Sequence, residues 1–179
     1  MSMIRVTVEG VGLDPSQGPV VVLKESDGDR ILPIWIGPSE ASAIQMKLEG
    51  QEFIRPLTHD LIHMLLSEVN VTLEKIEITA LEDTTYFAAL ILNTGEETVR
   101  VDARPSDSIA VALRCDAEIF ADDTLFRDPA SVVTSLNPEE DGIVSEETRE
   151  NKADRDRESL KKRLRDIDPG SFGFFRLGG

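Results

Sequence analysis

Two arginines in this sequence stand directly before a proline at the start of a predicted helix. Arg55 precedes Pro56, and Arg104 precedes Pro105 and Ser106. Proline holds the residue before it in an extended conformation, so each guanidinium projects from the point where the chain enters the helix. The free N–H groups of a helix start and the donor fork of an arginine both suit a phosphate. We therefore predict that Arg55, Arg104 and Ser106 bind phosphate.

Acidic side chains and a histidine accompany these arginines. His59 and Asp60 follow the first arginine, Asp107 follows the second, and Glu40 takes the corresponding place in an earlier, similar segment. Histidine transfers protons near neutral pH, and carboxylates orient a histidine or bind Mg²⁺ or Mn²⁺. These residue types predict a catalytic set of His59, Asp60, Asp107 and Glu40. Asp60, Asp107 and Glu40 are also the candidate metal ligands.

Simpler structural roles explain part of this pattern. A hydroxyl followed by a carboxylate is typical of a helix N-terminus. Three residues fit the N-cap position on this basis: Ser39, Thr58 and Ser106. The two arginines could also pair with acids nearby and fix the loops. The acids in reach along the chain are Asp60, Asp102 and Asp107.

The two histidines allow a further interpretation, because His59 and His63 lie one helical turn apart and could share a metal ion. The zinc-protease pattern needs Glu after the first His and a third ligand downstream, whereas this chain has Asp there and no other His. The sequence favours a partly buried, hydrogen-bonded His63 and assigns proton transfer to His59. The single Cys115 excludes an internal disulfide and is expected to be a small buried residue.

The elements that position these residues repeat along the chain. IGPSEASAI at residues 36–44 is similar to ARPSDSIAV at 103–111, and each begins a predicted helix. Strand patterns precede the first segment at 3–9, 19–25 and 30–36, and the second at 72–81, 85–93 and 97–103. A helix at 58–69 and a short strand at 118–122 complete the order. We predict an α+β fold: an antiparallel or mixed sheet of about six to seven strands with three main helices, in two similar βββα halves.

Composition limits the classes of function. The chain has 179 residues and a formal net charge of −15, which argues against a broad basic surface for nucleic acid and makes any such binding local. No apolar run is long enough to span a bilayer, and the first residues lack a signal-peptide pattern, so we expect a cytoplasmic protein with no membrane partner. We predict one domain at 1–130 and an acidic linker at 131–147. A basic helical segment with a Phe- and Gly-rich tail, at 148–179, either docks a protein partner or is a frayed terminus.

Three segments resemble the signature blocks of the bifunctional nuclease domain family. They are LPIWIGPSEASAI (32–44), RPLTHDL (55–61) and VDARPSDSIAVALR (101–114), within a similarity that spans about residues 3–127. The resemblance implies a cytoplasmic α+β domain, a homodimer, and degradation of both DNA and RNA. The matching positions are Glu40 in the first block, Arg55, His59 and Asp60 in the second, and Asp102, Arg104, Ser106 and Asp107 in the third.

Two hypotheses about function result. The first is a nuclease that hydrolyses phosphodiester bonds of DNA or RNA, in which the arginines hold the phosphate. His59, or a carboxylate-bound Mg²⁺ or Mn²⁺ with its water, would activate the nucleophile. The second is a non-catalytic regulatory or ligand-binding dimeric module whose 148–179 tail docks a partner. A structural oligomer in which the repeated segments only cap helices is a weaker third.

Overall fold

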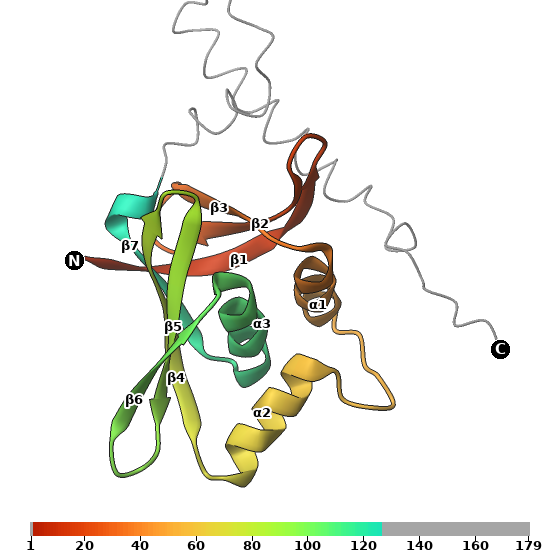
Figure 1. Ribbon diagram of the computed structural model, residues 1–179, viewed down its shortest axis with the longest axis vertical. Helices are drawn as coiled ribbons and strands as arrows, with labels where there is room; N and C mark the ends of the chain where they lie inside the picture. Colours follow the sequence, from red (N-terminus) through yellow and green to blue (C-terminus); the bar gives the residue numbers. More distant parts are fainter. Residues whose placement is uncertain (1, 127–179) are drawn as a thin grey trace, which may run out of the picture. The chain divides into compact units, whose positions relative to one another are not determined.

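The computed structural model describes residues 2–126 of the chain. The strands are β1 (Met3–Asp14), β2 (Gly18–Glu25), β3 (Ile31–Trp35), β4 (Thr72–Glu82), β5 (Thr85–Asn93), β6 (Thr98–Ala103) and β7 (Glu118–Asp122). The helices are α1 (Pro38–Leu48), α2 (Thr58–Glu68), α3 (Pro105–Cys115) and the 3₁₀ helix η1 (Asp123–Leu125) (Figure 1). The predicted linker at 131–147 and basic segment at 148–179 lie outside the described residues.

The seven strands form one mixed sheet in the order β3-β2-β1-β7-β4-β5-β6. β7 lies at the centre, antiparallel to β1 and parallel to β4, and an antiparallel meander extends from it on each side. One meander continues into α1 and the other into α3. The predicted α+β fold with two βββα halves is confirmed.

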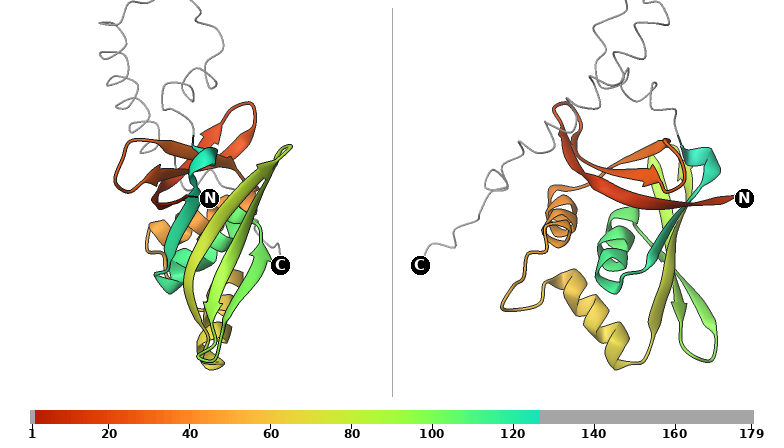
Figure 2. Two further views of the ribbon diagram at one scale, coloured as in Figure 1. Left: turned by 90° about the vertical axis from the view of Figure 1, so that its left-hand side faces the viewer. Right: turned by 180° about the vertical axis from the view of Figure 1, so that it is seen from behind.

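The three helices cover one face of the sheet (Figures 1 and 2). α1 packs on β1 and β2, and α3 packs on the strands around β7 and contacts both other helices. Most of α3 is buried, including Ile109 and Val111, which join Ile76 and Leu23 of the sheet in the core. α2 has no buried residue and rests on α3 at the periphery. Within residues 2–126, no helix is long and apolar enough to cross a membrane.

Both repeated segments begin their helix at the proline. Pro38 and Pro105 occupy the first turn of α1 and α3, a position where the missing N–H of proline removes no helical hydrogen bond. The N-cap residues are therefore Gly37 and Arg104, and neither makes a side-chain cap. The predicted N-caps Ser39 and Ser106 are wrong, because both residues already lie inside their helix.

The start of α2 differs from the prediction in the same way. Its N-cap is Leu57, and the predicted cap Thr58 is the first helical residue. Leu57 has no side-chain acceptor, and its own backbone N–H donates to the Asp60 carboxylate at 2.8 Å. A carboxylate one turn into the helix therefore stabilises this start in place of a hydroxyl.

Candidate active site

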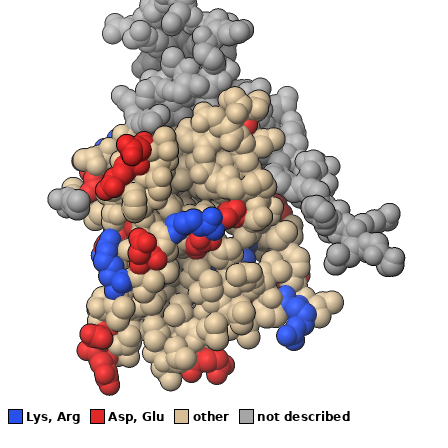
Figure 3. Space-filling view, in the orientation of Figure 1, with Lys and Arg blue, Asp and Glu red and all other residues tan. Residues whose placement is uncertain are grey.

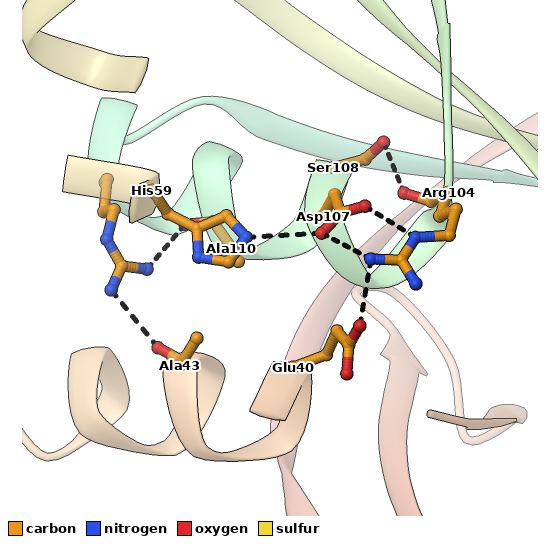
Figure 4. A network of polar contacts seen from close by, with 8 residues as sticks. Glu40, Ala43, His59, Arg104, Asp107, Ser108 and Ala110 are labelled. Atoms are coloured by element: carbon orange, nitrogen blue, oxygen red, sulfur yellow. Dashed lines mark hydrogen bonds and ion pairs between the residues drawn. The ribbon is translucent and has the colours of Figure 1, made fainter. Parts of the chain in front are cut away.

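The starts of α1 and α3 meet at one guanidinium group, that of Arg104. Its Nε donates to Asp107 Oδ2 at 2.8 Å and its Nη2 to Asp107 Oδ1 at 3.2 Å. The same Nη2 lies 2.9 Å from Glu40 Oε1 (Figure 4). Glu40 and Asp107 hold equivalent places in the two repeated segments, so the repetition brings two carboxylates to a single arginine.

His59 of α2 joins this cluster from the other side of Asp107. Its Nε2 lies 3.3 Å from Asp107 Oδ1, and its side chain is only 13% exposed (Figure 4). Burial opposes ionisation of Asp107, but hydrogen bonds from Arg104 and His59 outweigh it and hold the pKa of that carboxyl below its usual value. An ionised Asp107 can only accept a hydrogen bond, so His59 Nε2 carries the hydrogen in this contact. In the neutral ring, Nδ1 is then the acceptor nitrogen.

Asp60 has a different partner from the one that the sequence predicts. It pairs with Nε of Arg114, a residue that was not among the predicted site residues. Burial again opposes ionisation, but Arg114 and the Leu57 N–H outweigh it, so the pKa of Asp60 is lowered. The expectation that Asp60 orients His59 is corrected here, because Asp107 is the carboxylate in hydrogen-bond range of that ring.

Arg114 connects all three helices behind the cluster. Its side chain is 5% exposed, and besides Asp60 of α2 it donates to the carbonyl of Ala110 in α3 (2.8 Å) and of Ala43 in α1 (3.3 Å). A buried guanidinium with three acceptors fixes where α2, and therefore His59, lies against α3. The sequence feature that could have identified Arg114 is its position as a lone basic residue at the end of an apolar helix.

Three other predicted site residues take no part in the hydrogen bonds and ion pairs of this cluster within residues 2–126. Arg55 is exposed on the 49–57 loop, which projects outward between α1 and α2 (Figure 1), and no other described residue pairs with it. Ser106 is largely buried, at 6% exposure, in the first turn of α3. Asp102 is exposed on β6, where it lines a shallow cavity together with Arg100.

The acids do not form a ready metal site. Among residues 2–126, no group of three or more His, Cys, Asp or Glu side chains could hold a metal ion. His59 and His63 also have separate partners, since His63 Nδ1 lies 3.3 Å from Cys115 Sγ. Burial and the neighbouring Asp116 raise the pKa of the Cys115 thiol, so this thiol is not a ready nucleophile.

The charge balance of the cluster is negative. Glu40 and Asp107 face the single positive charge of Arg104, which leaves one excess negative charge when His59 is neutral. Arg104 still has binding capacity, because its side chain is 66% exposed and its Nη1 has no partner among residues 2–126. The cluster thus offers free guanidinium donors, an oriented imidazole and two carboxylates within a few ångströms.

Sequence comparisons with known proteins show which family the chain is similar to. The family model of the bifunctional nuclease domain matches residues 21–134. An uncharacterized protein of Mycobacterium tuberculosis is 40% identical over 77% of this chain and 83% of its own length. Bifunctional nuclease 1 of Oryza sativa subsp. japonica is 25% identical over 79% of this chain and 44% of its own length. Bifunctional nuclease 1 of Arabidopsis thaliana is 27% identical over 57% of this chain and 33% of its own length. On the family match and the Mycobacterium relative, the chain belongs to the bifunctional nuclease domain family.

Proposed function

We propose that this protein is a nuclease that hydrolyses phosphodiester bonds of DNA or RNA, with its active site at the Arg104 cluster. The observation that carries the proposal is the contact between His59 and Asp107, with Arg104 bonded to the same carboxylate. A general base, the group that orients it and a phosphate ligand are the parts that such a hydrolysis requires. The family match and the names of the plant relatives give independent support.

Each residue has a distinct role in this proposal. Asp107 holds the His59 ring so that Nδ1 accepts a proton from the attacking water. Arg104 donates its free Nη1 hydrogens to the scissile phosphate and stabilises the charge that develops in the transition state. Arg55 attracts the substrate from its exposed loop. Asp60 acts through Arg114, as a residue that positions α2.

The excess negative charge of the cluster sets a requirement for this mechanism. A phosphodiester approaching Arg104 also meets Glu40 and Asp107, so the repulsion has to be offset. A bound Mg²⁺ or Mn²⁺ would make the cluster positive and leave His59 able to act as the base, whereas protonation of His59 would neutralise the cluster but remove the base. Because the described residues form no ready metal site, dependence on a divalent cation is a question for the assay and not a step of the mechanism.

The decisive experiment compares two histidines on one helix. We expect His59→Ala to lower the cleavage of single-stranded DNA and RNA by about 100-fold or more, the usual contribution of a general base. His63→Ala is the matched control, because His63 lies one turn along α2 and contacts Cys115 instead. Cleavage is measured with EDTA, Mg²⁺ and Mn²⁺, on protein separated from host nucleases.

A second pair of variants tests the phosphate ligand. Arg104→Ala should abolish most of the activity, whereas Arg100→Ala, an exposed arginine of β6 that pairs with Glu77, should not. Activity that co-purifies with the protein and is unchanged in both His59→Ala and Arg104→Ala would reject this site. No activity under any of the three metal conditions would reject the nuclease proposal itself.

One exposed surface favours the homodimer that the second candidate function, a regulatory or ligand-binding dimeric module, requires. The helix α2 and the chain on either side of it expose large apolar side chains: Leu48, Phe53, Ile54, Leu61, Met64, Leu65 and Val69. The face of the molecule that includes these elements carries few charged groups (Figure 3). An apolar surface of this kind is typical of a protein–protein interface, and a second copy of the chain is the proposed partner.

The homodimer is tested by changing charge on this surface. Leu65→Glu should convert a dimer to a monomer in sedimentation velocity, because it places a carboxylate within the apolar surface. Leu13→Glu is the control, since Leu13 is more exposed (61% against 55%) but lies on β1. A wild-type chain that is monomeric at micromolar concentration, or equal effects of the two changes, would contradict dimerisation through α2.

A further inference from the structure

Two positive side chains near the Arg104 cluster have no acidic partner within residues 2–126. They are Lys47 and Arg55, and both are exposed. The other lysines and arginines of this part of the chain each pair with at least one acid: Arg5, Lys24, Arg30, Lys75, Arg100, Arg104 and Arg114. In a chain with a net charge of −15, an unpaired cation is therefore the exception, and the place of these two in the fold is informative.

Lys47 lies on the same side of α1 as the cluster. It follows Glu40 by seven residues, which is two helical turns or about 10 Å, so the two side chains project from the same face of the helix. Arg114 donates to the carbonyl of Ala43, one turn before Lys47. Burial opposes ionisation of Asp60 and Arg114 favours it, and the charge of Lys47 adds a smaller effect that lowers the same pKa. Lys47 is therefore close to the first turn of α2.

Arg55 is held near the same place by the chain itself. His59 follows it by four residues, so the two residues are at most about 14 Å apart. Along α1, Arg104 contacts the first turn, whereas His59 lies toward Ala43 (Figure 4). Lys47 is one turn further in that direction, and the loop that carries Arg55 leaves α1 at this end (Figure 1). His59 therefore lies between the free Nη1 of Arg104 and the two unpaired cations.

We propose that these three positive groups bind successive phosphates of a single-stranded nucleic acid, with the scissile phosphate at Arg104 and the phosphates beyond it at Lys47 and Arg55. This inference rests on the proposed nuclease function and names the form of its substrate. Lys and Arg side chains are the usual ligands of phosphate groups in nucleic acids. A flexible single strand can follow cations on three different segments, whereas a short duplex is stiff and requires a broader basic surface.

The test measures binding without cleavage. The full chain carries His59→Ala so that the probe stays intact, and a fluorescein-labelled oligothymidylate of about twenty nucleotides is followed by fluorescence anisotropy at increasing NaCl. We expect Lys47→Ala and Arg55→Ala each to lower the slope of log affinity against log salt by about 0.7, the value for one phosphate contact with a single strand. Lys75→Ala and Arg5→Ala are the matched controls, because both side chains pair with acids on the sheet, and should leave the slope unchanged.

Two further measurements separate a phosphate contact from a structural role. Lys47→Arg keeps the charge and should keep the slope, and the duplex of the same length should bind at least tenfold more weakly than the single strand. Unchanged slopes in both Lys47→Ala and Arg55→Ala, equal changes in the two controls, a duplex that binds as tightly, or no binding of the single strand would overturn the proposal.

Failure of this proposal and failure of the nuclease proposal give different results. Cleavage by the wild-type chain together with unchanged slopes would reject the roles of Lys47 and Arg55 and leave the nuclease in place. The expected slopes without any cleavage by the wild-type chain would reject the nuclease and support the three phosphate-binding groups.

Discussion

Burial, and not the number of ion pairs, should decide which arginine stabilises this fold. Arg114 and Arg30 provide the comparison. Arg114 has one carboxylate partner and a side chain that is 5% exposed. Arg30 has two, Glu25 and Asp123, and a side chain that is 39% exposed. We predict that Arg114→Met lowers the free energy of unfolding far more than Arg30→Met.

The expected magnitudes follow from the surroundings of each guanidinium. Removing one partner of a buried ion pair costs about 3–5 kcal/mol. Because the Asp60 side chain is 33% exposed, water relieves part of the penalty, and the lower end, about 3 kcal/mol, is the expected loss for Arg114→Met. An exposed pair contributes only about 0–1 kcal/mol, so the two pairs of Arg30 and its contact with the Phe126 ring should together stabilise the fold clearly less than the buried pair of Arg114.

The assay is urea unfolding of both variants, followed by the fluorescence of Trp35, the only tryptophan, and by circular dichroism. The reasoning is refuted if Arg30→Met costs as much as Arg114→Met, or if Arg114→Met costs less than about 1 kcal/mol, the size of an exposed pair. Asp60→Asn combined with Arg114→Met should cost less than the sum of the single changes, because the first change already breaks the pair.

Two further changes probe the Arg104 cluster. The pKa of Asp107 is lowered in the folded state, so its ionised form adds stability above the ordinary Asp pKa of about 3.9, and this is lost as pH falls below it. The stability difference between wild type and Asp107→Asn should therefore shrink from pH 6 to pH 3 in urea unfolding; a constant difference would contradict the assignment. Gly37→Ala would place a Cβ 2.3 Å from Glu40 Oε2, at an ordinary φ of −71°. The Glu40 carboxylate should move off Arg104 at a cost below about 1 kcal/mol, the value of an exposed pair. A larger loss, or an unmoved Glu40 in a crystal structure, would contradict this.

Most strands and turns of this fold are predictable from local sequence patterns. Residues 3–9 of β1 alternate in hydrophobicity, β2 and β3 are apolar runs joined at a turn that contains Asp27 and Gly28, and β5 and β6 are joined at a turn where Gly95 has φ of +86°. The N-caps of α1 and α3 lie two residues before the predicted serines, because proline occupies the first position of each helix. The central place of β7, between the two halves, is a long-range pairing that no local pattern specifies.

The Arg104 cluster is predictable only in part, because it too depends on contacts between residues distant in the sequence. Residues that begin the two repeated helices, Glu40 and Asp107, are brought together because equivalent elements occupy equivalent places in the two halves. Arg55 is not brought to them, since a projecting loop has no packing that fixes its side chain. Arg114 was missed because its role depends on burial against Asp60 and Ala43, residues distant in the sequence.

The difference between the two repeated segments explains the charge of the cluster. Gly37 occupies the place that Arg104 takes in the second segment, and even a Cβ there would collide with the Glu40 carboxylate. Any larger residue at this place would therefore require the Glu40 side chain to shift, and with glycine there the repetition yields two acids around one guanidinium. A phosphate that binds Arg104 has to overcome the repulsion of these acids. A bound cation, or a Glu40 that swings out, would relieve this repulsion while His59 stays neutral as the base, and the two mechanisms differ in their dependence on metal, so the activity assay distinguishes them.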